Sequence, residues 1–273
     1  MWRNLMVCAA GVAVCLAHVA GRAGLVAQSG VTTNAVNISC LRALAEQGDP
    51  EAQNSLGCCC LTGKGLSINA AAGIQWLRKA AEKGHADACH NMGVCYYTGR
   101  GVAENKREAL QWYRKAAERG QPVAQYQLSW CYLAGEGVKK DNTAAVAWCR
   151  KAAQQGLAEA QFNLGMCYFT GEGVKTDKAA AFAWFQQAAQ QGHAEAQFKL
   201  GVCYGQGDGV TRDVVAAYKW LSIAGGGGSA ECTKLAEQMT AMQRADAQAQ
   251  AQQWRPEKKP VHHAAAGPGP AAR

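Results

Sequence analysis

The chain has 273 residues, of which 49% are hydrophobic and 18% are charged, so it holds enough apolar material for a sizeable core. Its formal net charge is +8, but residues 28–253 are nearly neutral, with 22 Lys and Arg against 19 Asp and Glu. Nucleic-acid binding usually requires a concentrated basic face, which dispersed charges do not supply. We therefore expect no nucleic-acid partner.

Residues 1–27 have the pattern of a signal peptide for export. Arg3 precedes an apolar stretch at residues 5–20, and small residues follow it, so we expect cleavage after Ala23 or Ala27. The apolar stretch has about 16 residues, whereas a membrane span needs roughly 20. An uncleaved anchor stays an alternative. We predict an exported protein, periplasmic or secreted, with no stable membrane span after cleavage.

Residues 28–48 are expected to form a helical cap that precedes a series of repeats. The repeats are five copies of a 36-residue unit, at 49–84, 85–120, 121–156, 157–192 and 193–228. The stretch "LGMCYFTGEGV" at 164–174 has a counterpart in every copy, and a tryptophan recurs at the same position of each copy, at residues 76, 112, 148, 184 and 220. A fixed period of this length is typical of repeat architectures.

Each copy predicts two antiparallel helices. In the fourth copy, Ala160, Leu164 and Cys167 lie on one face of the first helix, and Gly171 ends that helix because glycine adopts the left-handed conformation easily. Pro50 and Pro122 fit the first position of their helices.

The second helix of each copy is expected to begin at an Asn or Asp cap, whose side chain accepts hydrogen bonds from the free amides of the first turn. These caps are Asn69, Asn105, Asp141, Asp177 and Asp213. In the fourth copy the predicted buried face is Ala181, Trp184 and Ala188, and Gly192 ends the helix.

The segment "AEAQFNLGMCYFTGEGVKTDKAAAFAWFQQAAQQG" at 158–192 resembles the Sel-one-like repeat family, which is related to tetratricopeptide repeats. The resemblance covers about two thirds of the chain. It implies an all-α, right-handed α-solenoid whose first helices line a concave surface, and a binding or adaptor role without catalysis. Ser129 in place of glycine and Cys60 in place of tyrosine depart from the family pattern.

Residues 229–253 are polar and rich in Ala and Gln, and we expect one capping helix there. Residues 254–273 are of low complexity, and we expect them to be a disordered tail.

One row of cysteines recurs once per repeat, at Cys59, Cys95, Cys131, Cys167 and Cys203. Neighbouring first helices lie roughly 8–10 Å apart, whereas a disulfide requires Cα atoms within about 7 Å. Zinc ligands would have to converge on one point. We interpret the row as small buried side chains, and we expect no metal site and no cofactor.

Three cysteines of an N-terminal cluster are candidates for one disulfide. Cys40 lies seven residues before the end of its helix, and Cys58 lies seven residues after the start of the next helix. Such positions face each other in an antiparallel hairpin, so Cys40 could bond to Cys58 or to Cys59 in an exported protein. Some family relatives carry a disulfide in each repeat, but this chain lacks their regular cysteine pair.

The Gly-x-Gly loops faintly resemble anion sites, although a tight turn between helices explains all five copies. No Ser-x-x-Lys segment, P-loop or His-Glu-x-x-His motif occurs. His85 and His193 are interpreted as surface residues of equivalent turns. We therefore predict that the protein is not an enzyme, and we keep a secreted hydrolase acting on β-lactam or cell-wall material as the alternative.

A second stripe on the first helices carries the candidate partner-binding residues. They are Tyr126, Trp130, Phe162, Met166, Phe169, Phe198, His90 and Tyr97. Two explanations stay open: packing between neighbouring helices, and an aromatic groove for a protein or peptide segment, centred on Trp130. We predict an interaction scaffold that binds other proteins or peptides, and a structural spacer is a further alternative.

Overall fold

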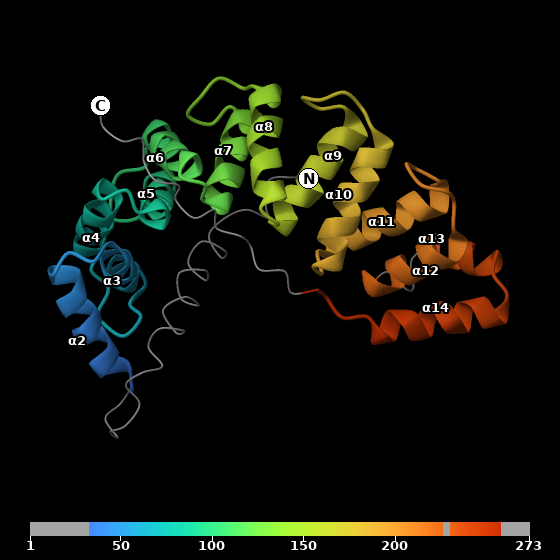
Figure 1. Cartoon of the computed structure of the whole chain (residues 1–273), viewed down its shortest axis with the longest axis horizontal. Coiled ribbons are helices and arrows are strands. Elements are labelled where there is room, and N and C mark those ends of the chain that lie inside the picture. Colours follow the sequence, from blue (N-terminus) through green and yellow to red (C-terminus); the bar gives the residue numbers. More distant parts are fainter. Residues whose placement is uncertain (1–32, 226–229, 258–273) are drawn as a thin grey trace, which may run out of the picture. The chain divides into compact units, whose positions relative to one another are not determined.

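The computed structural model describes residues 33–225 and 230–257, and the regular elements within these ranges are all helices. Figure 1 shows them in chain order. They are α2 (Thr33–Glu46), α3 (Pro50–Thr62), α4 (Ala70–Glu82), α5 (Ala86–Thr98), α6 (Lys106–Glu118), α7 (Pro122–Ala134), α8 (Asn142–Gln154), α9 (Ala158–Thr170), α10 (Lys178–Gln190), α11 (Ala194–Gln206), α12 (Val214–Ile223), α13 (Ala230–Glu237) and α14 (Ala241–Gln253).

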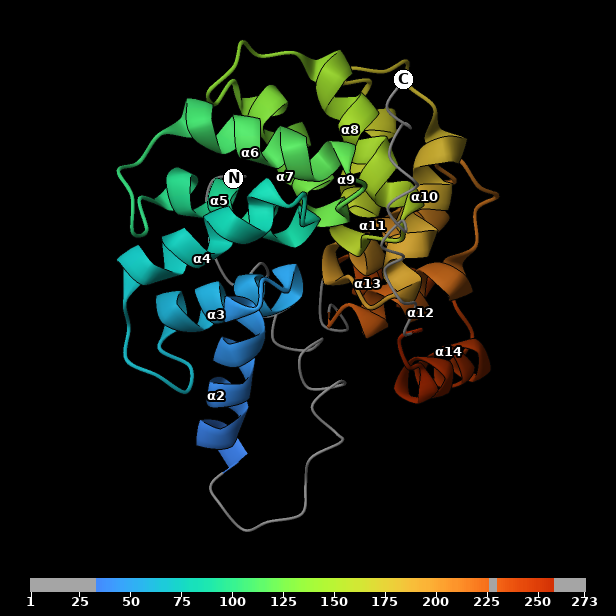
Figure 2. The same cartoon turned by 60° about the vertical axis from the view of Figure 1, so that its left-hand side comes forward.

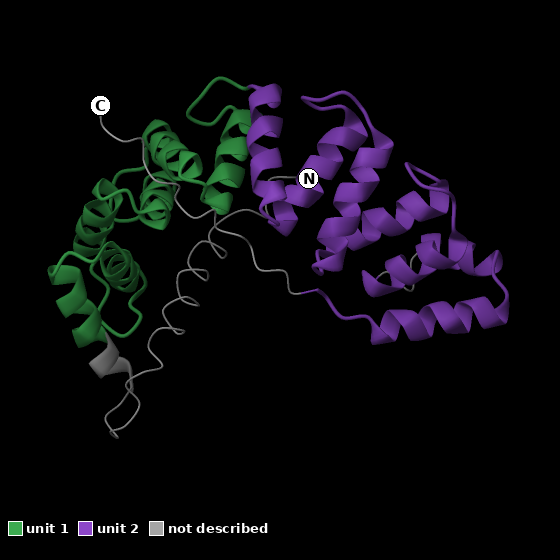
Figure 3. Ribbon diagram, in the orientation of Figure 1, with its two compact units in different colours: residues 1–140, 264–273 green, residues 141–263 purple. Residues whose placement is uncertain are grey.

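Consecutive helices pack in pairs, which confirms the predicted all-α repeat fold (Figure 2). The first helices of the five repeats are α3, α5, α7, α9 and α11, and the second helices are α4, α6, α8, α10 and α12. The chain divides into two compact units, and the boundary falls after Lys140, within the third repeat (Figure 3). Unit 1 contains α2 to α7, and unit 2 contains α8 to α14.

The helix ends are those that the residue types predict. Each expected Asn or Asp cap accepts a hydrogen bond from a first-turn amide, as Asp177 does from Ala180 at 2.9 Å. Pro50 and Pro122 begin α3 and α7. Gly171 ends α9 in the left-handed conformation at φ 79°, and its amide donates to the carbonyl of Cys167. These caps satisfy backbone groups that a helix leaves without partners.

The buried face of the second helices differs from the prediction by one residue. Trp184 is half-buried, whereas the next residue, Phe185, is fully buried. The residue after the tryptophan is buried in every repeat, as Leu77, Tyr113, Cys149, Phe185 and Leu221. A Lys three residues after the tryptophan stacks on its ring in the first three repeats, as Lys115 does over Trp112 at 4.0 Å. The tryptophan therefore covers the edge of the core rather than filling its centre.

Glycine on the first helix makes room for this core residue. A Cβ at Gly165 would lie 2.7 Å from the ring of Phe185, too close for a real contact. The third repeat departs from this pattern at both positions, since it has Ser129 where the other repeats have glycine and Cys149 where they have a bulky side chain.

Buried glutamines join each first helix to the helix before it. Gln53, Gln125, Gln161 and Gln197 are nearly fully buried. Each side-chain amide donates to the carbonyl eight residues earlier in the chain, at 3.0–3.2 Å. In the second repeat Cys89 takes this place, with its Sγ 3.8 Å from the carbonyl of Ala81. These bonds satisfy carbonyls at helix ends that would otherwise be buried without partners.

From the second repeat on, the second glycine of the Gly-x-Gly loop lies against the backbone of the preceding repeat, as Gly101, Gly137, Gly173 and Gly209 do. At Gly173 and Gly209 a Cβ would collide with the first-turn carbonyls of Asn142 and Lys178. The residue between the two glycines contacts the same turn, since Asp208 pairs with Lys178 at 2.6 Å. Equivalent contacts join Glu136 to Lys106 and Glu172 to Asn142. The loop is therefore a contact between successive repeats, and the tight-turn interpretation explains only part of it.

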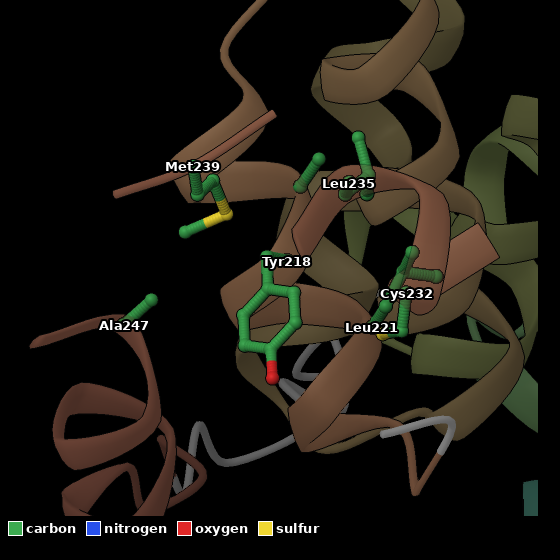
Figure 4. Close-up of a cluster of buried hydrophobic side chains, with 7 residues drawn as sticks. Tyr218, Leu221, Cys232, Leu235, Met239 and Ala247 are labelled. Carbon is green, nitrogen blue, oxygen red and sulfur yellow. The ribbon is translucent and has the colours of Figure 1, made fainter. Parts of the chain in front are cut away.

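Both ends of the repeat series carry additional helices. Before the first repeat, Ala45 of α2 packs with Leu56 of α3. After the last repeat, the structure has two helices, α13 and α14, where the sequence led us to expect one. Thr240 and Gln243 form a capping box that begins α14, and Met239 packs with Tyr218 of α12 (Figure 4). The capping box explains the break, because it satisfies the amides of a new helix start.

The predicted signal peptide, residues 1–27, lies outside the described residues, as does most of the predicted tail. Residues 254–257 of that tail are described, and they pack on unit 2.

Replacing Gly173 by Ala should destabilise the protein more than replacing Gly156 by Ala. Both glycines have positive φ, of 73° and 89°, but a Cβ at Gly156 would have no atom within 4 Å. The Gly156→Ala change should cost about 1–2 kcal/mol from backbone conformation alone. The Gly173→Ala change should add about 1–3 kcal/mol, because the side chain collides with backbone. Urea unfolding followed by circular dichroism measures both, and equal losses would contradict the loop contact.

Candidate protein-interaction surface

The stripe predicted to bind a partner is divided between the two units. His90, Tyr97, Tyr126 and Trp130 belong to unit 1, and Phe162, Met166, Phe169 and Phe198 belong to unit 2. The exposure and the contacts of these side chains differ strongly between the two groups.

Two residues of the unit 1 group are core residues and not surface residues. His90 is 3% exposed and Tyr126 is 6% exposed. The ring of His90 lies 5.8 Å from that of Tyr113, and its Nε2 is buried without a hydrogen-bond partner. Burial lowers the pKa of His90 to about 4, so the ring is neutral at pH 7. Neither side chain is available for a partner to contact, which corrects their assignment to the binding surface.

The other two residues of this group form a hydrogen-bonded chain. The hydroxyl of Tyr97 donates to Oε2 of Glu136 at 2.5 Å, and Nζ of Lys106 lies 2.9 Å from Oε1 of the same carboxylate. Trp130 also hydrogen-bonds to Tyr97, and burial raises the pKa of Tyr97 well above its usual value. Trp130 therefore joins α7 to α5, as the packing explanation expects. Its contact with a partner stays a prediction.

The unit 2 group is the more accessible one, and we call Phe162, Met166, Phe169 and Phe198 the aromatic face. The three residues on α9 are half-buried and pack against the cluster that contains Phe185. Phe198, on α11, is 37% exposed. The ring centroids of Phe162 and Phe169 lie 5.8 Å and 6.3 Å from that of Phe185, so the aromatic face rests on a firm aromatic core.

Polar residues of α11 border the aromatic face. His193, at the start of α11, stacks on Phe162 with ring centroids 4.8 Å apart. Its Nδ1 accepts from the amide of Ala196, so His193 is a helix cap and not merely a surface residue, and burial lowers its pKa. Lys199 places its Nζ 5.9 Å from the centre of the Phe169 ring. The side chains of His193 and Lys199 therefore reach Phe162 near the start of α9 and Phe169 near its end.

Two lysines lie near the ring of Phe169, and they differ in whether they form a salt bridge. Lys178 also approaches this ring, at 5.8 Å, but it is paired with Asp208. Lys199 has no salt bridge within the described residues. The aromatic face thus carries one cation that could pair with a carboxylate of a partner.

The cysteine row consists of small buried side chains, as the spacing predicts, except that Cys167 is only half-buried. Burial raises the pKa of Cys95 and of Cys131 to about 12, so these thiols are protonated at neutral pH. A protonated thiol is a poor nucleophile and a poor metal ligand. Groups of three or more side chains able to hold a metal ion do not occur within the described residues.

The three cysteines proposed for a disulfide differ in how far they are exposed to solvent. Cys40 is exposed, whereas Cys58 and Cys59 are buried, and no disulfide joins any of the three in the structure. The amide of Asn91 donates to Sγ of Cys58 at 3.3 Å. A bond from Cys40 to Cys58 or Cys59 stays a prediction that this geometry does not support.

Comparison with known proteins places these observations in a family. The model of the Sel1 repeat matches residues 50–85, 86–121, 122–157, 158–193 and 194–229. The chain belongs to the Sel1 repeat family. The matched segments differ by one residue from the repeat bounds that the sequence predicts. No curated protein sequence matches the chain.

Two solved structures resemble this Sel1 repeat chain. One is c5321, a protective antigen of uropathogenic Escherichia coli with an SLR fold, at 33% identity and a TM-score of 0.73 over 89% of this chain. The other is a Sel1 repeat protein of Oxalobacter formigenes, at 31% identity and a TM-score of 0.69 over 84% of this chain. The chain spans 52% of the length of the first and 65% of the length of the second.

None of the helices in the described ranges combines the length and the apolar composition that crossing a bilayer requires.

The stability of the protein should fall between pH 6.5 and about pH 4 because of His90. Above pH 6.5 the ring is neutral in both the folded and the unfolded chain. Below it, the unfolded chain binds a proton that the folded chain does not bind until about pH 4. This difference amounts to about 3 kcal/mol.

His90→Phe restores the residue type that Phe162 and Phe198 provide at the same position, and it removes this titration. Urea unfolding at pH 7, 5.5 and 4 should therefore show a smaller loss of stability for His90→Phe than for the natural chain. Parallel losses in the two chains would show that His90 is not protected from protonation.

Proposed function

We propose that this protein is a non-catalytic scaffold that binds a segment of a partner protein at the aromatic face of unit 2. The observation that carries the proposal is the exposure of Phe198 on α11, the helix whose His193 cap and Lys199 lie next to the half-buried Phe162 and Phe169 of α9. Apolar patches on a protein surface often mark interaction sites. Membership of the Sel1 repeat family supports the general role, because Sel1 repeat proteins are generally interaction scaffolds.

The chemistry of the aromatic face indicates what the partner segment contains. Phe198 and Met166 offer contact to an apolar side chain, and methionine adapts its shape to different partners. Lys199 offers a positive charge next to Phe198. A segment with an apolar residue flanked by Asp or Glu satisfies both requirements.

The repeats hold this surface in place before binding. Phe162 and Phe169 pack against buried Phe185, α11 begins at the His193 cap, and both α9 and α11 end at a left-handed glycine. Little conformational freedom of the scaffold is therefore lost when a partner docks, and most of the ordering cost falls on the partner segment.

The hydrolase alternative has no support in the site geometry. His90 is buried, and the thiols of Cys95 and Cys131 have raised pKa values. Turnover of nitrocefin or of peptidoglycan by the purified protein would revive that alternative.

Selection of peptides from a display library tests the proposed surface. We expect the selected sequences to combine an apolar residue with Asp or Glu. Their affinity should fall at least about tenfold for Phe198→Ala, as for a central interface residue. It should fall less for Lys199→Ala, which removes only a charge at the border of the face.

Met242→Ala is the matched control, because Met242 is 84% exposed but lies on α14, away from the aromatic face. Peptides that bind Phe198→Ala as tightly as the natural chain would place the binding site elsewhere. So would peptides that no longer bind Met242→Ala. A chain from which no peptide is selected would favour the structural spacer.

We also infer that the protein is exported by the signal pattern at residues 1–27. Mass spectrometry of the protein from its native source should give an N-terminus after Ala23 or Ala27. A mature chain that starts at Met1 and is found with the membrane would favour the uncleaved anchor.

A further inference from the structure

The segment after α14 returns to the repeats and makes three contacts in four residues. The ring of Trp254 meets that of Trp220 edge to face, with centroids 6.1 Å apart. Pro256 lies against Gly192, where an added Cβ would be 3.2 Å from the proline side chain. The amide of Glu257 donates to the carbonyl of Gln190 at 2.8 Å. Figure 1 shows this segment leaving α14 at the end of the red ribbon.

The surface that receives this segment has features that suit an extended peptide. Gln190 is the last residue of α10, and helix-end carbonyls lack donors within their own helix. Gly192 presents no side chain, which lets a proline approach the backbone. Trp220 packs on the cluster of Leu200 and its neighbours, so its position is fixed by the core.

Trp220 lacks the stacked lysine that the equivalent tryptophans of the first three repeats have. In those repeats the lysine three residues later stacks on the indole ring at 3.8–4.4 Å. The fifth repeat has Ile223 at that position, and the nearest cation to the ring, Lys219, is 5.8 Å from its centre. An aromatic residue from elsewhere can therefore reach Trp220.

The segment is separable from the helix that carries it. α14 is held by Ala247, which packs in the cluster of Tyr218, and by Gln248, whose amide donates to the Tyr218 hydroxyl at 2.9 Å. Neither contact involves residues 254–257. The side chains of Arg255, Pro256 and Glu257 are exposed. Release of the segment therefore exposes Trp220 without removing the contacts that hold α14.

We propose that Trp220, Gly192 and the end of α10 form a peptide-binding site for short extended segments of the type Trp-x-Pro, and that residues 254–257 occupy this site as a ligand from the same chain. The site uses different residues from the aromatic face, and its occupation by the tail regulates access to it. A tethered ligand acts at an effective concentration of about millimolar, so an external peptide competes only at similar concentrations or when the tail is displaced.

Hydrogen exchange of the Glu257 amide tests the contact within the full chain. The amide should exchange at least about tenfold more slowly in the natural chain than in Trp254→Ala, since that change removes the aromatic anchor but leaves Glu257 in place. Trp254→Ala alters only the tail, so the repeats should keep their fold. Equal exchange in the two chains would overturn the proposal.

Binding of a separate peptide tests the site itself. The probe is the synthetic peptide QQWRPEKKP, residues 252–260 of this chain, and the control is the same peptide with Ala in place of Trp. Added to full-length Trp254→Ala at up to about 5 mM, the range set by the effective concentration of a tethered tail, the probe should shift the NMR signals of the Gly192 amide and the Trp220 indole N–H.

The natural chain should respond at least tenfold more weakly to the probe, because its own tail fills the site. The control peptide should produce no shift in either chain. No response of Trp254→Ala to the probe, or equal responses of both chains, would overturn the assignment of this surface as a peptide site.

Discussion

The backbone contact between each Gly-x-Gly loop and the first turn of the preceding second helix determines how one repeat follows another. Only a residue without a side chain can lie where Gly173 and Gly209 do, against the carbonyls of Asn142 and Lys178. The charged residue between the glycines then contacts the same turn, as Asp208 does. Because the glycine contact recurs from the second repeat to the fifth, the same relation between neighbouring helices recurs along each unit.

The functional surfaces follow from this regular stacking. It brings the start of α11 beside Phe162 and the middle of α11 beside Phe169, so aromatic residues of one repeat meet polar residues of the next. In the fifth repeat the lysine of the pattern is absent, and Trp254 contacts the ring of Trp220. The site at Trp220 therefore arises where one repeat departs from the lysine that the first three repeats carry.

Much of the fold could be predicted because its signals are local. Asp177 and Gly171 begin and end helices through bonds to nearby backbone, and a single segment reveals them. The candidate site was harder to predict, because the exposure of a side chain depends on residues that are distant from it in sequence. Phe198 and His90 hold equivalent positions, yet one is exposed and the other is buried. The capping box of Thr240 and Gln243 was a local signal that could have been recognised.

The central claim is that the aromatic face of unit 2 binds a partner segment, and methionine methyl NMR tests it most directly. Met166 lies on this face, whereas Met92 and Met239 are buried and Met242 is exposed on α14. A bound peptide selected against the natural chain should shift the methyl signal of Met166 and leave those of the other three unchanged. A shift of Met242 without any change at Met166 would contradict the claim.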